Sequence, residues 1–325
     1  MAGVKPSLAV DLNGVVFPLP VLAAAGCLGT GRDGGGLVDL HRLGGVVTRS
    51  LTLHPGKGTS TPRMAETAAG LLTSVGLQNP GVEAFVSEDL PRLVRAGVPV
   101  IASVAGASLE EYIRVASFLH SKPGITAIEV YLSAPDDERG GGRPFYSHLE
   151  RIIEVIGSVA RLSRIPVFAK LPALLPDLEE TAGACVRAGA HGLTLIDGVP
   201  GMSVDTTRLR ANLSTVIGGL SGPSIRPIAL AAVYRVAQAM PDVPIMGVGG
   251  IGTGDDAVEF LLAGAWAVQV GTAMLVNPSA PAEIAHGIHR HLKTTGFASA
   301  ADLRGRLRGT EYAHGHWTGN GEESA

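Results

Sequence analysis

Short apolar runs alternate with longer amphipathic stretches between about residues 20 and 275 of the chain. The apolar runs lack polar alternation, which is typical of parallel strands that are buried on both faces. The predicted strands are Pro20–Ala24, Gly45–Thr48, Val98–Ser103, Ala127–Leu132, Ile165–Lys170, Gly192–Asp197, Val243–Val248 and Ala265–Val270. The helices predicted between them are Val82–Ala96, Leu109–His120, Ser147–Leu162, Leu178–Ala188, Pro227–Met240, Gly254–Ala263 and Pro281–Lys293.

This alternation predicts an α/β fold, a (β/α)8 TIM barrel, with an open doubly wound sheet as the alternative. The glycine-rich turns gather in the final third of the chain, which favours the barrel, and they are Gly218–Gly222, Gly247–Gly254 and Gly271–Thr272. We expect residues 1–308 to form a single domain and residues 309–325 a mobile C-terminal tail. The long insertion Leu51–Pro80 after the second strand is expected to lie over the barrel mouth.

Composition narrows the class of protein. The chain has 325 residues, of which 46% are hydrophobic and 17% charged, so a disordered chain is excluded. A net charge of −3 with only 4% aromatic residues does not suggest nucleic-acid binding. The two cysteines, Cys27 and Cys185, form no metal-binding spacing. Without a signal peptide or a membrane-length apolar run, we expect a soluble cytoplasmic protein.

Two features predict a phosphorylated, negatively charged cofactor at the barrel mouth. The last two strands run into Gly247–Gly254 and Gly271–Ala273, and barrel loops at these positions commonly bind phosphate. Lys170 ends the fifth strand, where a cation suits the charged edge of a reduced flavin. The alternatives are glycines used only for tight turns and a lysine that extends to the rim.

The sequence resembles the dihydroorotate dehydrogenase family over nearly its whole length. The segments that carry the resemblance are Ala23–Gly26, Gly44–Ser50, Thr61–Arg63, Val75–Gly81, Gly218–Pro223, Gly247–Ile251 and Val268–Ala273. The resemblance implies an FMN-dependent barrel similar to the soluble class, a homodimer by default, and a possible separate electron-transfer partner. It also implies FMN contacts from Ala24, Ala25, Gly26, Thr48, Lys170, Ser221, Gly222, Gly249, Gly250, Gly271 and Thr272.

The substrate side departs from the family pattern. Ala134 stands where the family has its cysteine or serine base, and a methyl group accepts no proton. Four positions where the family has substrate-binding asparagines carry Tyr131, Asp136, Thr73 and Asp197. The family's lysine after the second strand is replaced as well, and the substrate-binding candidates are therefore Arg49, Thr73 and Asp136. Added carboxylates would repel the orotate anion unless they are neutralised.

These departures predict an FMN oxidoreductase that moves hydride to or from flavin N5 but acts on a small molecule other than dihydroorotate. Tyr131, paired with Asp197, is the candidate for proton transfer. Ser133 is the alternative base, in which case activity on dihydroorotate would persist. A catalytically silent flavin-binding subunit and a barrel without flavin are the remaining hypotheses.

Overall fold

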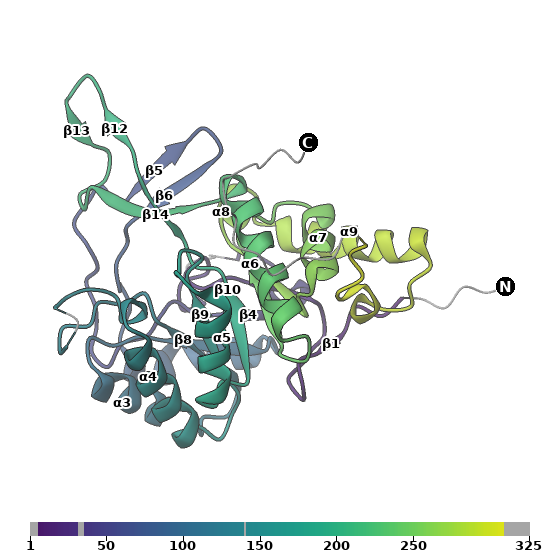
Figure 1. Ribbon diagram of the computed structural model, residues 1–325, viewed down its shortest axis with the longest axis horizontal. Coiled ribbons are helices and arrows are strands. Elements are labelled where there is room, and N and C mark those ends of the chain that lie inside the picture. Colours follow the sequence, from purple (N-terminus) through teal and green to yellow (C-terminus); the bar gives the residue numbers. More distant parts are fainter. Residues whose placement is uncertain (1–5, 32–35, 140, 309–325) are drawn as a thin grey trace, which may run out of the picture.

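The centre of the molecule is a closed barrel of eight parallel strands (Figure 1). The computed structural model describes residues 6–31, 36–139 and 141–308, and the predicted tail 309–325 lies outside the described residues. Around the barrel the strands follow the order β10-β15-β16-β3-β4-β7-β8-β9. Their bounds are β3 Val21–Ala23, β4 Gly45–Val47, β7 Val100–Val104, β8 Ile125–Tyr131, β9 Val167–Leu171, β10 Gly192–Leu195, β15 Ile245–Val248 and β16 Ala267–Val270. All eight predicted strands are present, and the predicted barrel is confirmed.

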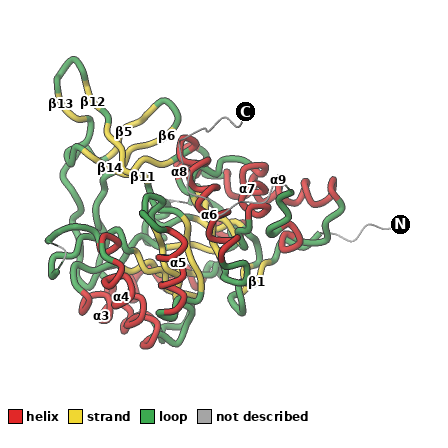
Figure 2. The backbone as a smooth tube through the Cα atoms, viewed as in Figure 1, coloured by secondary structure: helices red, strands yellow, loops and turns green. Residues whose placement is uncertain are grey.

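The barrel strands are apolar because nearly all of their residues are buried on both faces. Only Thr126 and Tyr131, both on β8, are partly exposed. Helices surround the barrel, as Figure 2 shows in red. Their bounds are α1 Val82–Ala84, α2 Leu90–Arg95, α3 Leu109–Leu119, α4 Leu149–Leu162, α5 Leu178–Arg187, α6 Arg226–Ala239, α7 Gly254–Ala263, α8 Thr272–Val276 and α9 Ala280–Thr295. Shorter turns are the 3-10 segments η1 Leu40–Arg42, η3 Phe145–Ser147, η4 Pro223–Ile225 and η5 Ala300–Leu303, and a π-helical turn η2 Phe85–Asp89 between α1 and α2.

Side-chain caps fix where several helices begin. The Ser108 hydroxyl accepts a hydrogen bond from the backbone N–H of Glu111 at the start of α3. Thr253 and Asp256 form a reciprocal capping box on α7, directly after the glycine-rich turn that follows β15. Because each cap sets the end of the preceding loop, it also sets how far that loop reaches over the barrel mouth.

A second, four-stranded antiparallel sheet caps the barrel (Figure 1). Its order is β11-β14-β6-β5, with β5 Met64–Thr67 and β6 Gly70–Thr73 from the insertion after the second barrel strand. The other two strands, β11 Val199–Met202 and β14 Ile217–Ser221, follow β10. This placement puts the sheet at the C-terminal ends of the barrel strands. The short hairpins are β1 Val10–Asp11 with β2 Val16–Phe17 and β12 Val204–Asp205 with β13 Arg210–Ala211.

One predicted turn is instead a strand. The segment Gly218–Gly222, expected to be a glycine-rich turn, lies mostly within β14 and pairs with both β6 and β11. Its glycines serve close packing of backbones: a Cβ on Gly218 would lie 2.7 Å from the carbonyl oxygen of Thr73. A Cβ on Gly70 of β6 would lie 2.2 Å from the carbonyl oxygen of Ser221. Glycine therefore permits this sheet to assemble, where the sequence suggested only a turn.

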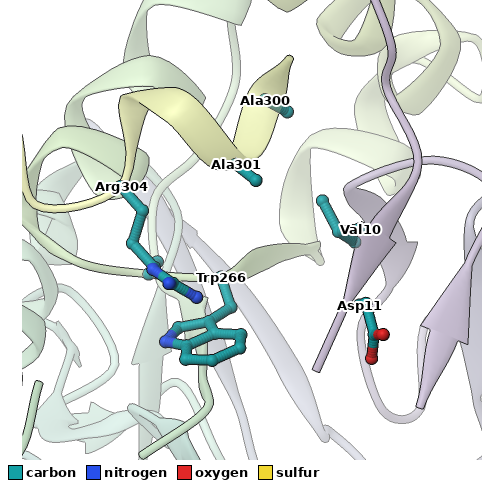
Figure 3. Close-up of a pocket in the computed structure, with 7 residues that line it drawn as sticks. Val10, Asp11, Trp266, Ala300, Ala301 and Arg304 are labelled. Carbon is teal, nitrogen blue, oxygen red and sulfur yellow. The ribbon is translucent and has the colours of Figure 1, made fainter. Parts of the chain in front are cut away.

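The opposite end of the barrel is closed by packed side chains. There the guanidinium carbon of Arg304 lies 3.5 Å from the ring centroid of Trp266, which precedes β16 (Figure 3). The cavity beside them measures about 10 Å³, room for roughly one water molecule. The cavity at the N-terminal ends of the strands is therefore too small for a ligand. A ligand site is expected at the C-terminal ends. Within the described part of the chain, no helix is long and apolar enough to cross a membrane.

Candidate active site

A polar layer lies inside the otherwise apolar barrel near its C-terminal end. Glu129 of β8 is fully buried, and its Oε2 accepts hydrogen bonds from Thr194 Oγ1 at 2.9 Å and Gln269 Nε2 at 3.1 Å. Its other oxygen, Oε1, lies 4.0 Å from the ammonium of Lys170. These residues come from β8, β9, β10 and β16, so the layer joins four of the eight strands.

Lys170 is the buried cation of this layer. Its side chain is 7% exposed, and its Nζ lies 3.9 Å from Oδ1 of Asp197 as well as 4.0 Å from Glu129. Burial alone would lower the pKa of Lys170, but the two carboxylates outweigh burial and raise it above its ordinary value. The ammonium is therefore charged at neutral pH, as expected of a cation that faces an anionic ligand.

Sequence reasoning missed Glu129 and Gln269. Their signal was present, because Glu129 is the one charged residue of β8 and Gln269 is the one polar residue of β16. Among the described residues, Glu129 Oε1 and Gln269 Oε1 have no hydrogen-bond partner. Unsatisfied buried acceptors are costly and mark sites where strain or a ligand compensates.

The predicted proton-transfer residues lie together at the mouth. Tyr131 is the last residue of β8, and the side chains of Asp197 and Ser133 both act on the pKa of its hydroxyl. Burial, followed by the charge of Asp197, raises the pKa of Tyr131 well above its ordinary value. The phenol therefore stays protonated at neutral pH and can donate a hydrogen bond to Asp197.

The predicted phosphate loops also come together. Gly249 has φ 136° and Gly250 has φ 72°, values that disfavour any side chain. A Cβ on Gly250 would lie 2.8 Å from the backbone nitrogen of Arg226 and from the carbonyl oxygen of Gly222. Thr272 Oγ1 hydrogen-bonds Ser221 Oγ at 2.8 Å, which ties the loop after β16 to the end of β14. Backbone N–H groups are therefore concentrated at one corner of the mouth.

The loop after β3 lies beside the same corner. A Cβ on Gly271 would meet Cys27 Sγ at 3.5 Å and Ala24 Cβ at 3.6 Å, so the predicted Ala24–Gly26 segment lies against the β16 loop. Desolvation raises the pKa of the Cys27 thiol to about 11, although Lys170 and Arg49 act against this. Cys27 is therefore a neutral thiol here. Thr48 was also predicted to contact FMN. It is fully buried, and its hydroxyl accepts a hydrogen bond from the backbone N–H of Ser103.

Arg49, a predicted substrate-binding residue, and Arg63 of the insertion converge on Gln78. Arg49 donates to the backbone oxygen of Gln78 at 3.2 Å, and Arg63 donates to its Oε1 at 2.7 Å. Arg49 lines a cavity of about 340 Å³ at the edge of the mouth. Thr73 lies on β6 in the cap sheet, where it pairs with Gly219. Gly219 in turn lies against Gly198, the neighbour of Asp197, so the cap brings Thr73 towards the site.

Asp136 requires a correction, because its carboxylate is fully engaged elsewhere. Only 1% exposed, it accepts hydrogen bonds from Arg151 Nε at 2.7 Å and Arg151 Nη2 at 3.2 Å. It also accepts from the backbone N–H groups of Glu138 and Arg139. This geometry assigns Asp136 to holding the loop after β8, and the predicted role in binding substrate is not supported. Ala134, in the same loop, is 1% exposed and its carbonyl accepts from Phe145.

Comparisons with known proteins agree over almost the whole chain. The sequence model of a family described as dihydroorotate dehydrogenase matches residues 7–292. A Geotalea daltonii protein is 42% identical over 94% of this chain and 99% of its own length. A Desulforudis audaxviator protein is 44% identical over the same shares. Both are named dihydroorotate dehydrogenase B (NAD(+)), catalytic subunit. A crystal structure of Eimeria tenella DHODH with ferulenol superposes with a TM-score of 0.78 at 19% identity, covering 94% of this chain and 90% of that one, which supports the fold.

The comparisons overturn the functional prediction made from the sequence. We expected an enzyme acting on a substrate other than dihydroorotate, or a silent flavin-binding subunit, but relatives of such similarity are named dihydroorotate dehydrogenases. The structure supplies a physical reason for the error. The carboxylates expected to repel an anion are already partnered, Asp136 by Arg151 and Asp197 by Lys170. Substitutions at a few positions of the predicted substrate site therefore did not indicate a different substrate.

The buried Asp136–Arg151 pair makes a prediction about stability and pH. The hydrogen bonds and charge of Arg151, with backbone N–H groups, outweigh burial and lower the pKa of Asp136. A lowered carboxyl pKa contributes stability that is complete above the unfolded value of about 3.9 and is lost as pH falls through the folded value. We expect Asp136→Asn to lower the free energy of unfolding by about 3–5 kcal/mol at neutral pH, with the difference shrinking below about pH 4. Urea denaturation across this pH range measures it.

A matched control is Asp205→Asn. Asp205 also accepts from two following backbone N–H groups, those of Thr207 and Arg208, and pairs with the Arg208 guanidinium. That guanidinium is 69% exposed, so the control should cost at most about 1 kcal/mol. Equal effects of the two substitutions would contradict the assigned role of the buried pair.

Proposed function

The chain belongs to the dihydroorotate dehydrogenase family, and we propose that it oxidises dihydroorotate to orotate with FMN bound at the mouth of the barrel. The observation that carries the proposal is the similarity to named catalytic subunits, 42% and 44% identical over 94% of the chain. The site supports it independently, because a buried cation and a glycine corner lie at the same end of the barrel. Bound FMN would supply a ring that accepts two electrons as hydride.

The residues at the mouth fit such a cofactor. The phosphate would lie at the glycine corner, where side chains on Gly249 and Gly250 would collide with Ala229 and Arg226 and the backbone is left bare. The flavin would lie between the Ala24–Gly26 loop and Lys170. There the ammonium would stabilise negative charge on the edge of the flavin ring. Glu129 and Asp197 would hold the ammonium in place. The residues proposed for the phosphate are Ser221, Gly222, Gly249, Gly250, Gly271 and Thr272.

We also propose that electrons leave through a separate electron-transfer subunit to NAD⁺. The names of the relatives support this, since each specifies a catalytic subunit and NAD(+). The partner therefore re-oxidises the cofactor, and this chain performs the half-reaction with dihydroorotate. That division makes the half-reaction measurable on the chain alone.

The direct test is an anaerobic visible spectrum of purified protein, reconstituted with FMN, before and after dihydroorotate is added. We expect the flavin absorbance to bleach, because hydride transfer from the substrate reduces the ring. Orotate added in place of dihydroorotate should leave the flavin oxidised and serves as the control. A flavoprotein that stays yellow with excess dihydroorotate contradicts the proposed reaction.

Lys170→Ala should weaken FMN binding, because it removes the charged group proposed to face the ring edge. A loss of one charge-assisted hydrogen bond, about 1.5–3 kcal/mol, corresponds to roughly 10–150-fold in Kd. Fluorescence titration of apoprotein with FMN measures this change. The exposed Lys293→Ala variant is the control and should bind as the parent does. Undiminished affinity in Lys170→Ala would remove Lys170 from the cofactor site.

We also propose that two copies of the chain form a homodimer and that they contact each other through the cap sheet and its hairpins. Large apolar side chains between 47% and 86% exposed occur on the cap sheet and its hairpins, and they are Met64, Met202, Val204, Leu209, Val216 and Ile217. Exposed apolar surface of this kind favours association. Light scattering should give twice the chain mass of 33.3 kDa, and Leu209→Glu with Ile217→Glu should shift the mass towards that of the monomer. A monomer in the parent protein would contradict the proposal.

A further inference from the structure

Oxidation of dihydroorotate releases a proton, and a group in the site must accept it. Forming the ring double bond removes a hydride from one carbon and a proton from its neighbour. By resemblance, Ala134 occupies the position of the family's base, and its methyl group accepts nothing. The Cys27 thiol is neutral, with a pKa of about 11. The question of which group takes the proton rests on the proposed function, and the mouth of the barrel offers one arrangement that answers it.

Tyr131 points into the mouth above the buried polar layer. It lies two residues after Glu129 on β8, and alternate residues of a strand share a face. Its register partner on β9 is Lys170, so the phenol belongs to the same side of the barrel wall as the ammonium. The hydroxyl of Tyr112 donates to the backbone oxygen of Tyr131 at 2.6 Å, which holds the end of the strand. The backbone that carries the phenol is thus held at the mouth.

Asp197 lies behind the phenol, two residues after β10. Its carboxylate lies 3.9 Å from the ammonium of Lys170, the register partner of Tyr131, and its negative charge raises the pKa of the phenol. The carboxylate is 22% exposed, so a proton placed on it has a route to solvent. Ser133 acts in the opposite sense to Asp197 and lowers the pKa of the phenol. Since the phenol itself stays protonated, it can take up a proton only while it gives its own to Asp197.

We propose that Tyr131 and Asp197 form the proton-accepting pair that replaces the missing base. The electron pair of the C5–H bond of dihydroorotate becomes the C5–C6 double bond, and hydride leaves C6 for the flavin, which is thereby reduced. The C5 proton goes to Tyr131 Oη as the phenolic proton passes to the carboxylate of Asp197. Tyr131 is the catalytic residue that meets the substrate, and Asp197 is the final acceptor, which returns the proton to solvent.

The test follows the anaerobic half-reaction by stopped flow in the FMN-loaded protein. Tyr131→Phe removes one oxygen and should slow flavin bleaching by dihydroorotate by about 10²–10⁴-fold, the usual range for acid–base catalysis. Asp197→Asn should slow it comparably while keeping the side-chain volume. With substrate deuterated at C5, the isotope effect should rise in Tyr131→Phe, because loss of the C5 proton becomes the slow event. The Kd of orotate, read from the flavin spectrum, should change less than about threefold.

Tyr146→Phe is the matched control. Tyr146 lies in η3, between β8 and α4, and burial followed by the charge of Asp197 raises its pKa too. We expect its bleaching rate to stay near that of the parent. A Tyr131→Phe variant that bleaches normally overturns the proposal, and a slow Ser133→Ala beside it would assign the proton to Ser133. Parent protein that dihydroorotate does not bleach overturns the proposed function as well, so the two failures are distinguishable.

Discussion

An ammonium group buried at the mouth of an apolar barrel is stable only when carboxylates neutralise it. Lys170 meets this condition through Glu129 below it and Asp197 beside it, at 4.0 Å and 3.9 Å. Glu129 is itself held by Thr194 and Gln269 from two further strands. One buried lysine therefore accounts for the polar residues found on four strands of the barrel. The proposed contact with the flavin and the proposed proton transfer both depend on this lysine.

The barrel could be predicted from the sequence because its strands are continuous apolar runs, a signal that is local and strong. The glycine loops after β15 and β16 and the position of Lys170 were predictable for the same reason, since strand ends locate them. The cap sheet was not, because β6 pairs with β14 across about 150 residues and both strands are rich in glycine. Strand propensity carries no information about such a partner.

Side-chain roles at the mouth depended on contacts that no local pattern reveals. Asp136 was expected at the substrate because of its place in a loop, whereas Arg151, on the helix that follows, takes up its carboxylate. Tyr131 and Asp197 were expected to act together; they follow one another around the mouth at the ends of β8 and β10, and the charge of Asp197 raises the pKa of the phenol. The positions of Tyr131 and Asp197 follow from the barrel topology, because strand ends converge at the mouth. The partner of Asp136 is known only from the three-dimensional structure.

The cap sheet also orders events while the chain is being made. Its first hairpin, β5–β6, is complete by Thr73, but the strand that covers its open edge begins only at Ile217. Contacts of such long sequence separation form late, because the intervening chain must first be ordered. A nascent chain therefore carries an uncovered hairpin edge through nearly half of translation, and association with other unfinished chains would begin at this edge.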